Sequence, residues 1–177
     1  ISIMNKLKKT ILFLLVVGSI NNTYSQNFSK RKVNDLKSHA AKLVEEDKKM
    51  TQVMIDKVFS FGELGFQEFE TSKYLSNILE ENGFELQYNI SDIPTSWLAT
   101  WSNGSGGPVI ALGSDFDGVP STSQYPGVAY EKPVVEGAPG HGEGHNIGLP
   151  IVITAALSIK KVMIENNING TLLLWPG

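Results

Sequence analysis

The residues best suited to chemistry lie in two glycine-rich clusters in the second half of the chain. The first cluster, residues 113–120, contains Asp115 and Asp117. Because these aspartates are two positions apart, an extended backbone projects both carboxylates to the same side. Paired carboxylates can bind a cation or orient a histidine that binds one. The alternative interpretation is an aspartate-rich turn whose side chains hydrogen-bond the neighbouring backbone.

The second cluster, residues 137–146, contains His141, Glu143 and His145 at successive alternate positions. In an extended backbone these three side chains face one way, and imidazole nitrogen with carboxylate oxygen is a usual donor set for zinc-type ions. The spacing is not that of the helical His-Glu-x-x-His zinc motif. A phosphate loop is disfavoured because no lysine or arginine, and no serine or threonine, opens the next helix. A flexible glycine loop with incidental histidines is the other interpretation, and the distant His39 is predicted to be a surface residue.

The elements that must position these clusters read as a mixed α/β fold. Apolar spacing predicts a helical stretch over 33–61 and a second helix that starts near Phe69 and ends at Asn82 and Gly83. Proline suits a first helical position, so the next helix is expected to start at Pro150 and run to about 166. Strands are predicted at 84–90, 96–101, 109–112 and 171–175, with a long loop over 113–148. This order predicts a mixed, twisted sheet flanked by helices.

Two of these strands are apolar throughout, which is typical of strands buried on both faces. Residues 109–112 are therefore expected to be central in the sheet. The run 171–175 is also expected to be central, yet only Pro176 and Gly177 follow it. The sequence thus suggests a piece of a longer protein, interrupted within a sheet.

Composition limits the class of protein. A chain of 177 residues with 41% hydrophobic and 19% charged residues suits one globular domain. Cysteine is absent, which excludes disulfide scaffolds, cysteine-ligated zinc and thiol nucleophiles. The net charge of −3 carries no basic patch, so no nucleic-acid partner is expected.

Residues 1–25 have the pattern of a signal peptide. Lys6, Lys8 and Lys9 form a basic region, residues 11–17 form an apolar core too short to span a membrane, and small residues precede Gln26. A short membrane anchor or a buried helix is the alternative. The pattern predicts an exported protein, periplasmic or secreted, without a stable membrane span after processing.

Three motifs resemble the zinc aminoacylase and carboxypeptidase family of amidohydrolases, a metallopeptidase family. They are residues 63–72 with 82–84 (ELGFQEFETS and NGF), residues 111–120 (ALGSDFDGVP) and residues 139–146 (PGHGEGHN). The most similar branch is that of aminobenzoyl-glutamate hydrolase and related exported amidohydrolases. The resemblance runs from about residue 35 to the end. It implies that residues 26–177 are the amino-terminal part of a catalytic domain with a zinc exopeptidase-like fold.

The resemblance also implies roles for individual residues. Glu143 and His145 correspond to metal ligands and Asp117 to an orienting acid, while Asp115 and His141 are further candidates. Many family members have cysteine where this chain has Glu143. Because a carboxylate is a harder donor than a thiolate, metal preference is expected to move from zinc towards manganese or cobalt.

The family implies two divalent metals per site, zinc or manganese, and hydrolysis of an N-acyl amino acid or dipeptide-like substrate by metal-activated water. The general-base glutamate of the family is expected shortly after Gly177, so this chain alone is predicted to be inactive. A homodimer is implied for the full-length protein. The alternative from a different functional class is an exported, non-catalytic module that binds a small ligand or a cation.

Overall fold

The computed structural model describes residues 26–177, so the predicted signal peptide at 1–25 lies outside the described residues. The elements follow in the order α2 (Lys30–Glu46), α3 (Lys48–Phe61), α4 (Phe69–Glu81), β1 (Glu85–Tyr88), the short 3-10 helix η1 (Ile90–Asp92), β2 (Trp97–Asn103), β3 (Val109–Ser114), α5 (His145–Glu165) and β4 (Gly170–Pro176).

The four strands form one mixed sheet in the order β1-β2-β4-β3, which confirms the predicted fold class. β2 runs antiparallel to β1 and to β4, whereas β3 and β4 are parallel and are connected through α5. The prediction that 171–175 is a central strand is confirmed. The prediction that 109–112 is central is wrong for the described residues, because β4 inserts between β2 and β3 and leaves β3 at the edge. Val109 and Ile110 of β3 are 61% and 47% exposed, so an apolar run by itself establishes neither burial nor a central place in the sheet.

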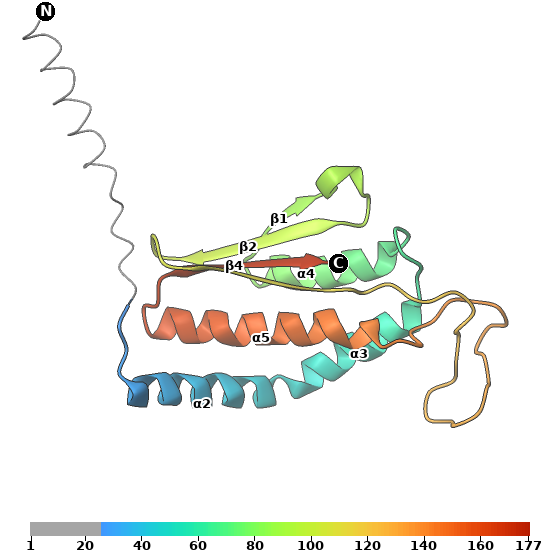
Figure 1. Cartoon of the computed structure of the whole chain (residues 1–177), viewed down its shortest axis with the longest axis horizontal. Coiled ribbons are helices and arrows are strands. Elements are labelled where there is room, and N and C mark those ends of the chain that lie inside the picture. Colours follow the sequence, from blue (N-terminus) through green and yellow to red (C-terminus); the bar gives the residue numbers. More distant parts are fainter. Residues whose placement is uncertain (1–25) are drawn as a thin grey trace, which may run out of the picture.

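Helix α5 lies between the sheet and the pair α2 and α3 (Figure 1). Among residues 26–177 it is the one helix long and apolar enough to cross a membrane, with a mean hydropathy of 1.8. Its buried residues Ile153 and Ala156 belong to the same core cluster as Leu172 and Leu174 of β4. The apolar character of α5 is therefore accounted for by its place in the core.

The boundaries of two predicted helices differ from those observed. The stretch 33–61 is two helices that meet at Asp47, inside the charge run 45–49. Helix α5 begins at His145, so the expectation of a start at Pro150 is wrong. Pro150 lies inside α5, five residues after its start, and has no N–H to donate to the carbonyl of Asn146, so the proline did not mark the first helical position. The end of α4 agrees with prediction, since Asn82 is the C-cap and Gly83 has a φ of +77°.

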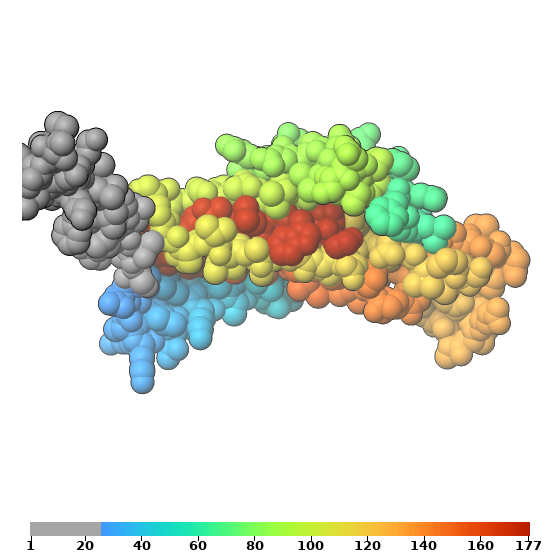
Figure 2. Space-filling model, turned by 45° about the horizontal axis from the view of Figure 1, so that its top comes forward, coloured from blue at the N-terminus to red at the C-terminus, as the bar shows by residue number. Residues whose placement is uncertain are grey.

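The face of the sheet opposite the core is open to solvent. Leu172 and Leu174 are buried, whereas Trp175 remains 39% exposed and Val109 of β3 61% exposed. Figure 2 shows atoms of β4 at the molecular surface on this side. The described residues therefore cover one face of the sheet with helices.

Candidate functional site

The two predicted clusters meet where β3 ends and α5 begins. Asp115 and Asp117 directly follow β3, and His145 is the first residue of α5. The carboxyl end of a parallel strand is where α/β folds usually form sites. A side chain at Gly148 would collide with the hydroxyl oxygen of Ser114, so this glycine allows the first turn of α5 to lie against the end of β3.

Three carboxylates surround the imidazole of His145. Nδ1 lies 2.7 Å from Oδ1 of Asp117, and Nε2 lies 2.7 Å from Oε2 of Glu143. Nε2 is also 3.4 Å from Oδ2 of Asp115. The structure thus brings together four of the five candidate residues, and they come from two segments that are separated by a long loop.

This environment changes the protonation of His145. Partial burial alone lowers the pKa of the imidazole, but the hydrogen bond to Asp117 and the charges of Glu143, Asp117 and Asp115 outweigh it. The net result is a pKa raised above the ordinary value of 6.5. With a proton on each nitrogen, the ring donates to Asp117 and to Glu143. The site therefore favours a positive charge at this position.

His141 does not join this cluster. Its side chain is buried, and its Nε2–H donates to the backbone carbonyl oxygen of Val58 at a distance of 3.0 Å. The expectation that His141, Glu143 and His145 face one way from an extended backbone is wrong, because the chain turns at 142–143 and enters α5 at His145. Burial lowers the pKa of the His141 imidazole, and the bond to Val58 offsets this only in part. Nδ1 of this ring is buried without a hydrogen-bond partner among the described residues.

A turn that sequence reasoning treated only as a motif also borders the site. Phe66 in this turn has a φ of +65°, and its N–H donates to Oε1 of Glu68 at 2.9 Å. Oε2 of Glu68 accepts from the hydroxyl of Thr95 at 2.7 Å, and both side chains are buried. A Cβ built on Gly65 would lie 3.5 Å from Oδ2 of Asp117, so the turn lies directly beside the candidate site.

Glu63 fixes the other side of the same turn. Its two carboxylate oxygens accept from the backbone N–H groups of Glu70 and Thr71, at 3.0 and 2.9 Å. These donors belong to the first turn of α4, which has no capping bond from the side chain of its own N-cap residue. The backbone oxygen of Glu63 accepts from the N–H of Gly118, which ties the turn to the aspartate cluster. The acidic residue ahead of a helix start was the available sequence signal for this role.

The donor types fit a divalent cation only in part. Glu143 supplies carboxylate oxygen and His145 imidazole nitrogen, which are usual ligands for zinc and manganese. Asp117 accepts from Nδ1–H of His145, and Nε2 of the same ring faces the Glu143 carboxylate. Once Nε2 has lost its proton, Nε2 and the Glu143 carboxylate can both bind an ion. Within residues 26–177, however, no three histidine, cysteine, aspartate or glutamate side chains already form a metal-binding cluster. The residues present are therefore part of a donor set.

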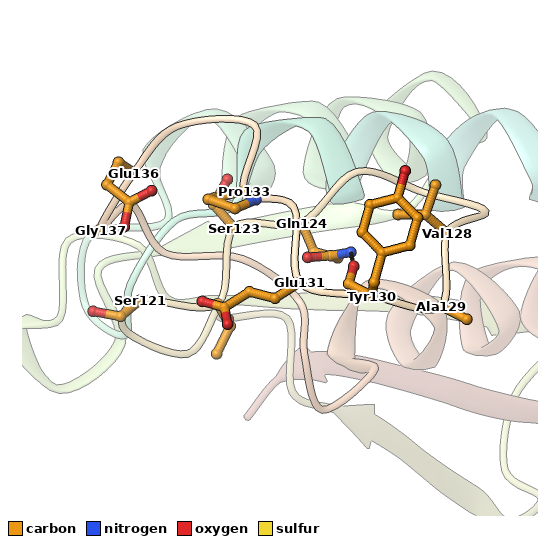
Figure 3. Close-up of a pocket in the computed structure, with 11 residues that line it drawn as sticks. Ser121, Ser123, Gln124, Val128, Ala129, Tyr130, Glu131, Pro133, Glu136 and Gly137 are labelled. Atoms are coloured by element: carbon orange, nitrogen blue, oxygen red, sulfur yellow. Dashed lines mark hydrogen bonds between the residues drawn. The ribbon is translucent and has the colours of Figure 1, made fainter.

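Two hollows lie near this end of the molecule. One, of about 410 Å³, is lined by Asp115, Asp117 and His145 together with the Phe66 turn. The other, of about 580 Å³, is formed within the long loop, where the side-chain amide of Gln124 donates to the carbonyl of Tyr130 (Figure 3). None of the five candidate residues lines the larger hollow. The smaller hollow is therefore the one that belongs to the candidate site.

Comparison with known proteins gives related sequences and folds. No protein-family model matches the chain. Over 136 residues it is 33% identical to one of the subunits of the p-aminobenzoyl-glutamate hydrolase of Escherichia coli, and the match covers 76% of this chain and 28% of that protein. This chain therefore spans little more than a quarter of that relative's length.

Two solved structures share the fold. A proposed aminohydrolase from methicillin-resistant Staphylococcus aureus has a TM-score of 0.65 at 19% identity, over 78% of this chain and 34% of that one. The YXEP protein of Bacillus subtilis, a dinuclear metal-binding peptidase of the M20 family, has a TM-score of 0.50 at 24% identity, over 73% of this chain and 35% of that one. Both agree with the mixed sheet and flanking helices described above.

Proposed function

We propose a function from the premise that this chain is part of an amidohydrolase of the M20 peptidase type, as its sequence and fold similarities indicate. The proposal is that the chain contributes metal-binding residues to an enzyme that hydrolyses an amide bond. The observation that carries it is the placement of His145 between Asp117 and Glu143 at the end of β3.

Each of these residues has a task that follows from its contacts. Asp117 accepts from Nδ1–H, which sets the tautomer of His145 and holds the ring in place. Nε2 of His145 and the Glu143 carboxylate are the two donors available to an ion. Asp115, 3.4 Å from Nε2, adds negative charge that favours a cation at this position. A bound divalent cation would polarise the amide carbonyl and make water a better nucleophile.

The finer features of the proposal come from the family resemblance. They are two divalent ions per site, zinc or manganese, and an N-acyl amino acid such as aminobenzoyl-glutamate as substrate. We propose that the general-base glutamate lies outside these 177 residues, and that the chain alone is inactive. The E. coli relative, named for its action on p-aminobenzoyl-glutamate, supports this choice of substrate.

Metal binding tests the proposal most directly. Calorimetry with Mn²⁺ and with Zn²⁺ should show binding to the complete gene product that is lost or strongly weakened in Glu143→Ala and in His145→Ala. Glu131→Ala is a matched control, because Glu131 lines the larger hollow in the same loop. Equal binding by the Glu143→Ala variant, or none by the unaltered complete gene product, would overturn the assignment of ligands.

Activity is tested separately. The complete gene product, loaded with either metal, should release p-aminobenzoate from aminobenzoyl-glutamate, and a chelator should abolish this release. The 177-residue chain alone should show no turnover. Metal binding by the complete product without hydrolysis of any N-acyl amino acid would instead favour a non-catalytic binding module.

We also propose that the protein is exported and that the full-length enzyme is a homodimer. The support for export is the basic and apolar pattern of residues 1–25. Amino-terminal sequencing of the secreted or periplasmic protein should begin at Gln26. Recovery of the intact amino terminus in the cytoplasm would contradict this. Sedimentation of the complete product should give twice the mass of one chain.

A further inference from the structure

The smaller hollow has an exposed aromatic side chain at its rim. Phe66 lines this pocket of about 410 Å³, which also contains His145 and Asp117, and it is 70% exposed. Ile93 lines the same pocket, and the buried ring of Phe116 lies at its wall. The pocket thus combines apolar surface with the candidate metal ligand.

The backbone at Phe66 is held in a costly conformation. A φ of +65° is rare for a residue other than glycine, asparagine or aspartate, and such strain usually persists where the surroundings enforce it. Here the Phe66 N–H donates to the Glu68 carboxylate. The same carboxylate accepts from the hydroxyl of Thr95, which lies two residues before β2. Both partners are buried, so the hydrogen bonds are shielded from water. These two hydrogen bonds, called the Phe66 clamp below, hold the exposed ring at the pocket. A turn without such a role could have had glycine at this position, because glycine adopts a positive φ without strain.

The charges of the pocket select against one kind of ligand. Asp115, Asp117 and Glu68 line it, and no lysine or arginine does so among the described residues. Among the described lining residues the one cationic group is the His145 imidazole, and it already has a carboxylate at each ring nitrogen. A further carboxylate would therefore face a net negative charge, which is unfavourable. A neutral aromatic group would instead pack on Phe66 and Ile93.

We propose that this pocket holds the neutral, aromatic acyl half of the amide substrate, and that Phe66 is a specificity-determining residue that stacks on it. The inference rests on the proposed function, since an acyl half has meaning only if an amide is the substrate. The carboxylate of the amino-acid half must then be bound elsewhere. Glu68 acts as a positioning residue that holds Phe66 in place.

Benzamide and benzoate are suitable probes, because they share a ring and differ in charge. Both are titrated into the full chain in metal-free buffer and followed by protein NMR. Benzamide should shift the amide signals of Phe66, Ile93 and Thr95, and benzoate should bind several-fold more weakly. Equal or tighter binding of benzoate would overturn the proposal, as would benzamide shifts confined to other parts of the chain.

Variants separate the ring from the fold. Phe66→Gly removes the ring, and glycine accepts the positive φ without strain, so stability should be kept while the Kd for benzamide rises about 2- to 10-fold. Phe69→Ala is the matched control, since Phe69 is 57% exposed and lines a different pocket. Glu68→Ala should weaken benzamide binding and lower stability together, because it removes the acceptors of both the Phe66 N–H and the Thr95 hydroxyl, and with them the Phe66 clamp. An equal loss in Phe69→Ala, or no loss in Phe66→Gly, would sink the assignment.

The outcome is independent of the metal tests. Metal binding by the complete gene product without a benzamide signal at Phe66 of the chain overturns this inference alone. Benzamide binding at Phe66 without metal binding by the complete gene product overturns the proposed function, and the bound ring is then not the acyl half of an amide substrate.

Discussion

Nδ1 of His145 lies 2.7 Å from Oδ1 of Asp117, although 28 positions separate the two residues along the chain. The contact joins the segment after β3 to the first residue of α5. An ionised carboxylate has no proton to donate, so the hydrogen bond requires a proton on Nδ1 of His145. Nε2 is then the ring nitrogen available to an ion. The candidate metal site therefore depends on the hydrogen bond between Asp117 and His145 as well as on the residues that would bind the ion.

Removing the charge of Asp117 should weaken metal binding. We expect Asp117→Asn to lower the affinity for Mn²⁺ or Zn²⁺ by about 10- to 100-fold, as is typical when the carboxylate partner of a ligand histidine is lost. Calorimetry on the folded variant measures this. Asp56→Asn, which alters an exposed contact with Gln52, is the control and should leave the affinity unchanged. An unaltered affinity in Asp117→Asn would remove its role as the orienting acid.

Exchanging the carboxylate ligand for a thiolate should change which metal is preferred. Glu143→Cys replaces a hard oxygen donor with a soft sulfur donor, so the ratio of Zn²⁺ to Mn²⁺ affinity should rise. Competition titration with both metals gives this ratio directly. If the ratio stays the same while both ions still bind, the side chain at 143 does not contact the ion.

The carboxylate of Glu63 should stabilise α4 through its two backbone contacts. Glu63→Ala leaves two N–H groups of the first turn without these acceptors, and we expect a loss of about 1 kcal/mol in the free energy of unfolding. Urea denaturation measures it. The control is Glu81→Ala, at the opposite, exposed end of the same helix, where the change should be within about 0.5 kcal/mol.

The close approach of α5 to β3 should depend on the missing side chain at Gly148. Gly148→Ala places a methyl group against the hydroxyl of Ser114, but that hydroxyl can rotate and alanine favours the helix, so we expect a destabilisation of at most about 1 kcal/mol. Ser114→Ala removes that oxygen and should recover part of the loss in the double variant. A double-mutant cycle by thermal or urea unfolding reports the coupling, and strictly additive effects would show that the two residues do not touch.

One tyrosine should titrate late. Burial raises the pKa of Tyr74 above its ordinary value of 10.0, and the ring packs edge-on against Phe61. A group whose pKa is raised on folding stabilises the folded state at lower pH, and this stability is lost as the pH rises through the folded-state pKa. The unfolding free energy should therefore fall above pH 10, and less steeply in Tyr74→Phe. In an ultraviolet titration, the rise in phenolate absorbance that occurs at the highest pH should be missing in Tyr74→Phe.

The sequence was sufficient to predict the parts of the site that depend on short spacing. Asp115 and Asp117, two apart after an apolar strand, do lie together, and Glu143 does contact His145. The place of His141 depends instead on its packing against α3, which local spacing does not encode. Similarly, nothing near position 66 announces the positive φ of Phe66, because its clamp requires Thr95, which comes 27 residues after Glu68.

The fold shows the same division. Helix periodicity predicted the positions of α4 and most of α2 and α3, since each buries one stripe of apolar residues. Strand order was beyond local patterns. β3 and β4 are both apolar, and β4 takes the inner place because it pairs with β2 as well as with β3, which local composition does not encode.

Because His145 opens a 21-residue helix whose body is anchored in the interior, the imidazole and the three carboxylates do not share the same freedom to change. The acidic partners lie outside the regular helices and strands, where side chains can be exchanged with less effect on the helix and the sheet. Natural variation and laboratory redesign are therefore expected to alter the candidate metal site by exchanging its carboxylate residues, while the imidazole of His145 keeps its position.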